Sequence, residues 1–79
     1  MKIKVRIAEK KTVSKEINSD YIRLDDFLKL NDAVQSGGHA KIVIQGGEVK
    51  VNGETCLSRG KKLRKGDSAE YNGTIYKVI

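Results

Sequence analysis

The chain has 79 residues and carries 16 Lys and Arg against 10 Asp and Glu, a net charge of +6. This length indicates one small domain over residues 1–79 with a modest core, and the positive balance favours polyanionic partners, nucleic acid before an anionic membrane. The single cysteine, Cys56, excludes an internal disulfide and fits a reducing cytoplasm, and no apolar run approaches the roughly 18 residues of a membrane span.

The first third of the chain changes from a strand pattern to a helix pattern. Residues 2–7, KIKVRI, alternate strictly and predict a half-buried strand with a basic outer face. Residues 15–22, KEINSDYI, predict a second short strand, with NSD as a turn. In LDDFLKLN the apolar residues fall at i, i+3 and i+4, which predicts a helix over Leu24–Asn31. Asp25 and Asp26 stand in its first turn, where the helix dipole favours negative charge.

A second helix is predicted from the capping residue Ser36 to the glycine pair Gly46-Gly47. The serine hydroxyl can accept a free N–H of the first turn, and AKIVI repeats the i, i+3, i+4 spacing of apolar residues. The glycine pair ends this helix because glycine adopts a left-handed conformation without steric cost. Lys41 lies on the face opposite the apolar one.

The rest of the chain returns to period two. Val49 and Val51 face one way and Lys50 the other, and Asn-Gly dipeptides at 52–53 and 72–73 predict two hairpins. The order strand, helix, helix, strands indicates an α+β domain, with two short helices packed on a small antiparallel sheet.

The glycines and the lone histidine do not indicate catalysis. Gly38 is followed by His-Ala-Lys without a Ser or Thr, so the pattern is not a nucleotide-binding Walker loop. His39 and Cys56 would have to be adjacent in space, with a third residue to orient the histidine, to form a nucleophile–base pair. No spacing typical of metal ligands exists. We therefore expect no enzymatic activity, no metal and no cofactor.

The segment RGKKLRK is the candidate binding site. It holds five cations within seven residues, carries no acid, and is bracketed by glycines that indicate turns. A fixed cationic patch of this kind suits a phosphate backbone. Few aromatic residues are present, which favours recognition of nucleic-acid shape and backbone over stacking on single strands. The predicted binding residues are Arg23, Lys41, Lys50, Arg59, Lys61, Lys62, Arg64 and Lys65.

Three stretches together resemble a known family. RLDDFLKL, SGGHAKIVIQGGEVKVNGE and RGKKLRKGD are similar to the S4 RNA-binding domain, or alpha-L RNA-binding motif, over roughly residues 21–68. Within it the chain resembles the small stand-alone bacterial proteins of the YaaA/YbcJ type. The resemblance implies binding to structured RNA, ribosomal RNA or tRNA, and it supplies no catalytic residue. We expect the protein to bind as a monomer.

Two positions depart from the pattern of the family. Gly37 and Ser58 stand where many relatives have an arginine, so the resemblance implies one phosphate contact fewer at each place. An alternative function is a protein-interaction adaptor in which RNA binding is secondary. Salt dependence distinguishes the two, since phosphate contacts release counterions and a protein groove does not.

Overall fold

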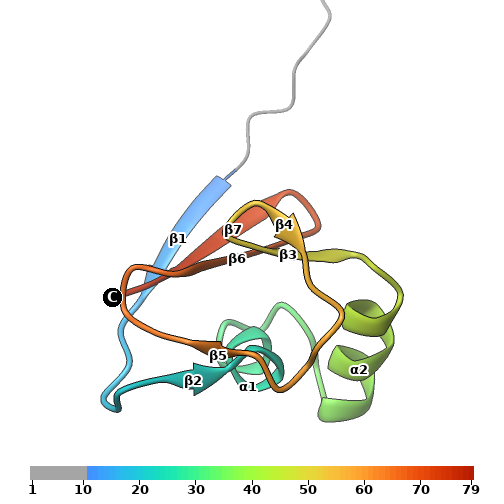
Figure 1. Ribbon diagram of the computed structural model, residues 1–79, viewed down its shortest axis with the longest axis horizontal. Coiled ribbons are helices and arrows are strands. Elements are labelled where there is room, and N and C mark those ends of the chain that lie inside the picture. Colours follow the sequence, from blue (N-terminus) through green and yellow to red (C-terminus); the bar gives the residue numbers. More distant parts are fainter. Residues whose placement is uncertain (1–10) are drawn as a thin grey trace, which may run out of the picture.

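The computed structural model describes residues 11–79, which form two helices on one side of a five-stranded sheet (Figure 1). The sheet order is β1-β7-β6-β3-β4. A separate two-stranded ladder of β2 and β5 lies beside the first helix. The helices are α1 (Leu24–Leu30) and α2 (Gly37–Gln45), and the strands are β1 (Lys11–Lys15), β2 (Ile22–Arg23), β3 (Val49–Val51), β4 (Glu54–Thr55), β5 (Lys62–Leu63), β6 (Ser68–Tyr71) and β7 (Thr74–Val78).

The α+β class with two short helices on a sheet is confirmed, and the sheet has one feature that the sequence did not indicate. The pairs β3–β4, β3–β6 and β6–β7 are antiparallel as expected. Strand β1, however, pairs with β7 in parallel, with Val13 opposite Tyr76. The sheet is therefore mixed. Parallel strands require a long crossover connection, and the segment between β1 and β7, which contains both helices, provides it.

The single strand predicted over residues 15–22 is wrong. Lys15 ends β1, residues 18–20 bend at the expected NSD turn, and the chain becomes extended again at Ile22. The strand KTVSK lacks the clean alternation of KIKVRI, which explains why the sequence did not reveal it. The strand predicted over residues 2–7 lies outside the described residues.

The ends of α2 follow the predicted chemistry. Ser36 is the N-cap, and its hydroxyl accepts a hydrogen bond of 3.1 Å from the backbone N–H of His39. At the other end Gly47 has φ +81° and donates to the carbonyl of Ile44, while Glu48 donates to the carbonyl of Val43. This pair of bonds is a Schellman motif, which ends the helix and directs the chain into β3.

Both Asn-Gly dipeptides form tight turns. Asn52 and Gly53 have φ of 51° and 87°, and Asn72 and Gly73 have φ of 53° and 81°. Two successive positive φ values are typical of the type I′ turn, whose twist matches that of the flanking strands. The predicted hairpins β3–β4 and β6–β7 are confirmed.

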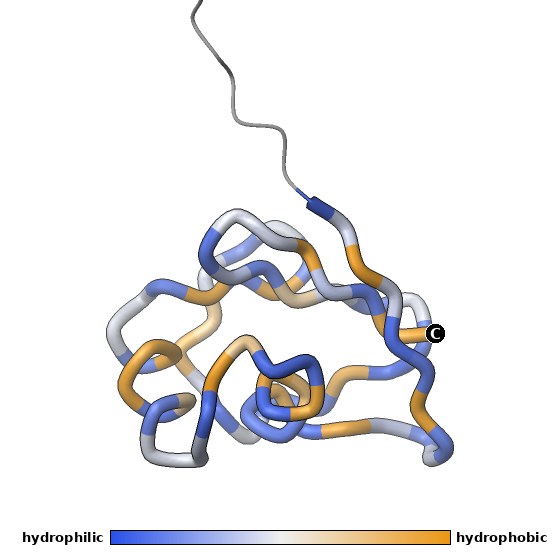
Figure 2. The backbone as a smooth tube through the Cα atoms, turned by 180° about the vertical axis from the view of Figure 1, so that it is seen from behind, coloured by the Kyte–Doolittle hydropathy of each residue, from blue (hydrophilic) through white to orange (hydrophobic). Residues whose placement is uncertain are grey.

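One apolar core joins the layers. Hydrophobic positions alternate with hydrophilic ones along the strands and helices (Figure 2). Leu24, Phe27 and Leu28 of α1 are fully buried. They belong to one cluster with residues of α2, the sheet and the ladder strand β5: Ala40, Val43, Ile44, Val49, Val51, Leu63, Ala69 and Val78. Within the described residues, neither helix is long and apolar enough to cross a membrane.

Candidate nucleic-acid interface

The basic segment, residues 58–66, is fastened to the start of α1 by its backbone. The first N–H groups of a helix have no partner within the helix. In α1, Leu24 N donates to Lys61 O at 2.8 Å and Asp25 N donates to Arg59 O at 3.1 Å. The segment therefore caps the helix with its own carbonyls. Because Leu63 is fully buried in the core, the cationic side chains around it project from a fixed backbone.

The β2–β5 ladder decides which cations share a face. Ile22 pairs with Leu63, and both turn toward the core. Arg23 pairs with Lys62 at the next position, and both are exposed. Residues opposite each other in an antiparallel pair point to the same side. The outer face of the ladder is therefore cationic.

Tyr21 is the centre of this outer face. The Lys62 Nζ lies 4.8 Å from the centroid of the Tyr21 ring, and the Arg64 Cζ lies 5.8 Å from it. Such cation–π contacts stabilise by about 0.5–1 kcal/mol at an exposed site. The ring gathers two cations that electrostatic repulsion would otherwise separate. We call the exposed side chains of Tyr21, Arg23, Lys62 and Arg64 the ladder face.

Asp25 holds Arg23 in place. Its Oδ1 accepts from Arg23 Nε at 3.2 Å and its Oδ2 accepts from Arg23 Nη2 at 3.1 Å. Asp25 is 8% exposed, whereas half of the Arg23 side chain is exposed. The bidentate contact fixes one edge of the guanidinium and leaves its other N–H donors for a phosphate. Asp25 thus has a more specific role than the predicted interaction with the helix dipole.

A second carboxylate fixes the far end of the basic segment. Asp67 Oδ2 accepts from Arg64 N at 2.7 Å, and Asp67 Oδ1 accepts from Asn52 Nδ2 at 3.1 Å. Asn52 Oδ1 in turn accepts from Ser68 N at 3.0 Å. The hydrogen bond from Arg64 N, with smaller effects of Asn52 and of the charges on Lys61 and Arg64, lowers the pKa of Asp67 and outweighs the opposing effect of burial. The β3–β4 turn and the basic segment are therefore joined.

Six of the eight predicted binding residues lie together, and the other two lie on separate elements. The basic segment and Arg23 lie together, at the start of α1. Lys41 is exposed on α2, outside the ladder. Lys50 is exposed between the buried Val49 and Val51, so it points away from the helices on the opposite face of the sheet. The residues brought together are Arg23, Arg59, Lys61, Lys62, Arg64 and Lys65.

Three residues that organise this surface are absent from the predicted binding set: Tyr21, Asp25 and Asp67. The sequence indicates only a helix-dipole role for Asp25. An Arg-x-Asp spacing at the start of a helix is a local signal for the Arg23–Asp25 contact. The bond between Asn52 and Asp67 crosses 15 residues of sequence, and no local pattern indicates it.

The chemistry available here is binding of anions. Arginine and lysine side chains on a fixed backbone make charge-assisted hydrogen bonds to phosphates at a reduced entropy cost. In residues 11–79 no group of three or more His, Cys, Asp or Glu side chains is arranged to hold a metal ion. His39 Nδ1 accepts from Gln35 N at 3.3 Å, so this imidazole has a local structural role.

Comparison with known families identifies the family to which this fold and its basic surface belong. The model of the S4 domain matches residues 15–79. The chain belongs to the S4 domain family. The match includes both helices, the ladder and four of the five strands of the large sheet completely. It is therefore longer than the resemblance over residues 21–68, and it extends to the last residue.

Two relatives are similar to this S4 domain over most of their length. A probable ribosome maturation protein of Bacillus subtilis (strain 168), RlbA, is 47% identical over 57 residues, which cover 72% of this chain and 80% of RlbA. The solution structure of Escherichia coli YbcJ, described as containing an alphaL motif involved in RNA binding, is 29% identical. It superimposes with a TM-score of 0.62 and covers 100% of this chain and 96% of YbcJ. The predicted likeness to small stand-alone S4 proteins is confirmed.

Proposed function

We propose that this S4 domain binds structured RNA and catalyses no reaction. The observation that carries the proposal is the ladder face, where Lys62 and Arg64 contact the Tyr21 ring and Arg23 pairs with Lys62, on a backbone held by the start of α1. The RNA-binding motif of YbcJ and membership of the S4 family support the same conclusion. Residues 58–66 contain no acid, so no carboxylate within the segment competes with phosphate.

Ribosomal RNA is the target that we propose. RlbA is described as a probable ribosome maturation protein, and the two chains share 47% of the aligned residues. The ladder face suits a highly structured RNA. It offers cations for phosphates and only one partly exposed aromatic ring, so it favours recognition of RNA shape and backbone over stacking on single-stranded bases. We further propose that the protein acts as a monomer in the cytoplasm.

The test is a fluorescence titration of a ribosomal RNA fragment at several salt concentrations, beside a duplex DNA of equal length. If about four to six phosphates are contacted, log K falls with log salt at a slope of roughly −3 to −5 for RNA. Sedimentation of the complex gives its stoichiometry, and we expect one chain per site. A flat salt response would contradict phosphate recognition and would favour the protein-interaction adaptor instead.

A further inference from the structure

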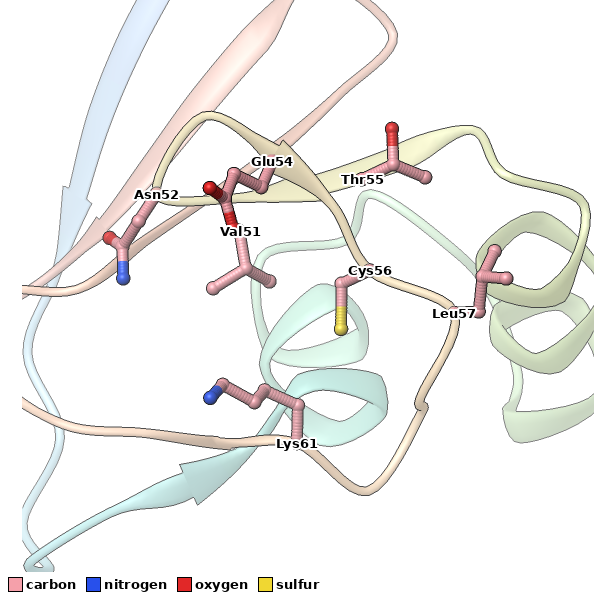
Figure 3. Close-up of a pocket in the computed structure, with 7 residues that line it drawn as sticks. All are labelled: Val51, Asn52, Glu54, Thr55, Cys56, Leu57 and Lys61. Atoms are coloured by element: carbon pink, nitrogen blue, oxygen red, sulfur yellow. The ribbon is translucent and has the colours of Figure 1, made fainter.

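A pocket adjoins the basic segment on the side away from the ladder face. It has a volume of about 370 Å³ and lies between the β3–β4 hairpin and the chain that leads from β4 to β5 (Figure 3). Pockets for small ligands span about 300–1,000 Å³, so this one is at the small end. Its lining is Val51, Asn52, Glu54, Thr55, Cys56, Leu57 and Lys61.

Two opposite charges line this pocket without pairing. Glu54 comes from the hairpin and Lys61 from the basic segment, on facing sides of the space in Figure 3. In the described part of the chain, neither side chain forms a hydrogen bond or an ion pair. The Asn52 amide, by contrast, is bound to Asp67 and Ser68. The pocket therefore presents an available carboxylate acceptor and an available ammonium donor.

The pocket also has an apolar wall. The side chains of Val51 and Cys56 point into the space between the hairpin and Lys61 (Figure 3). Leu57 lies at the end nearest α2 and is 58% exposed, one of the most exposed large apolar side chains in residues 11–79. A flat apolar ring with polar edges would cover these side chains and still meet the two charges. An apolar ligand would leave Glu54 and Lys61 without hydrogen-bond partners, and a small anion would leave the apolar wall exposed to water.

The position of the pocket relates it to the cationic surface. Lys61 and Lys62 are consecutive, and the strand at this point alternates its side chains between opposite sides. Lys62 joins Tyr21 on the ladder face, while Lys61 lines the pocket. The two surfaces therefore lie on opposite sides of the basic segment, and an RNA strand reaches both by passing around its edge.

We propose that this pocket binds one unpaired base of the bound RNA, with guanine preferred; this inference rests on the proposed RNA-binding function. The ring covers Val51 and Leu57, the Glu54 carboxylate accepts from the base edge, and Lys61 contacts the adjoining phosphate. Guanine fits because its Watson–Crick edge offers two neighbouring N–H donors to one carboxylate. Uracil offers one N–H flanked by carbonyl oxygens, which the carboxylate repels.

The experiment uses the full chain and four RNA hairpins that differ only in one unpaired nucleotide, G, A, C or U. We expect the G hairpin to bind about tenfold more tightly than the U hairpin, the discrimination of one bidentate contact. Glu54→Gln should reduce this preference to about twofold or less, because a neutral amide accepts more weakly. Glu48→Gln is the matched control: it removes the same charge from an exposed acid outside the pocket and should preserve the preference.

A second variant tests the apolar wall. Leu57→Ala should weaken binding to the G hairpin several-fold and leave binding to a fully paired RNA unchanged, since the exposed Leu57 contributes little to the core. Equal affinity for all four hairpins, with Glu54→Gln behaving like Glu48→Gln, would overturn the proposal that the pocket binds a base. The proposed RNA-binding function would remain intact. Failure of every RNA to bind would instead overturn the proposed function.

Discussion

The ladder face and the two isolated lysines carry similar charges in different settings. Lys62 and Arg64 contact one aromatic ring, and Arg23 lies opposite Lys62 in the ladder. Asp25 holds the Arg23 side chain and Asp67 holds the backbone at Arg64. Lys41 and Lys50 are exposed cations too, but each stands on its own element and face. Net charge treats the five residues as equivalent. RNA binding should distinguish them, because holding a long side chain in one geometry costs conformational entropy. Folding has already ordered the side chains of the ladder face, so less entropy is lost there on binding.

The sharpest test compares two double variants with the same change of charge. Lys62→Ala with Arg64→Ala should weaken RNA binding by about 30-fold, or about 2 kcal/mol, and reduce the salt slope by about two. Lys41→Ala with Lys50→Ala should weaken binding by about threefold or less. Fluorescence titrations at several salt concentrations measure both effects, and circular dichroism checks folding. Equal losses would show that binding follows bulk charge.

The two Asn-Gly turns allow a test of how the basic segment is fixed. Asn52→Ala and Asn72→Ala remove the same residue from the same turn type. Asn52, however, also bonds to Asp67 and Ser68 N across the sequence. We expect Asn52→Ala to lower the free energy of unfolding by about 1–2 kcal/mol more than Asn72→Ala does. Urea unfolding gives both values, and similar losses would mean that the bonds to Asp67 and Ser68 contribute nothing.

The role of Tyr21 can be separated from that of its hydroxyl. Tyr21→Leu removes the ring beside Lys62 and Arg64 and should weaken RNA binding by about twofold to fivefold, the equivalent of one exposed cation–π contact. Tyr21→Phe keeps the ring and should bind like the parent chain. The same titration measures both variants. If Tyr21→Phe weakened RNA binding as much as Tyr21→Leu, the hydroxyl and not the ring would be the group that matters for binding.

The smallest effect concerns pH. Because the pKa of Asp67 is lowered in the fold, its ionised form stabilises the protein above the ordinary Asp value of about 3.9. This contribution is lost as the pH falls through the lower folded pKa. Asp67→Asn should therefore lower the melting temperature at pH 7, and the difference from the parent chain should narrow as the pH falls below about 3.9. A difference independent of pH would show that the charge of Asp67 is irrelevant.

The sequence determined the features that depend on neighbouring residues. The helix N-cap at Ser36, the glycine stop after Gln45 and both Asn-Gly turns are local: each depends on backbone dihedrals or on hydrogen bonds within a few residues. The family pattern likewise depends on spacings along the chain. These parts could be predicted because their energies do not require knowledge of distant residues.

Contacts between distant segments set which cations share a surface. The parallel pairing of β1 with β7 joins segments about 60 residues apart, and the Asn52–Asp67 bond joins the β3–β4 turn to the end of the basic segment. Lys50 is among the predicted binding residues, yet burial of Val49 and Val51 places it on the face of the sheet opposite the helices. Lys61 and Lys62 are adjacent in sequence but serve different surfaces, because pairing with β2 fixes the direction of each side chain. Composition sets the number of cations, and the packing of the core sets where each one points.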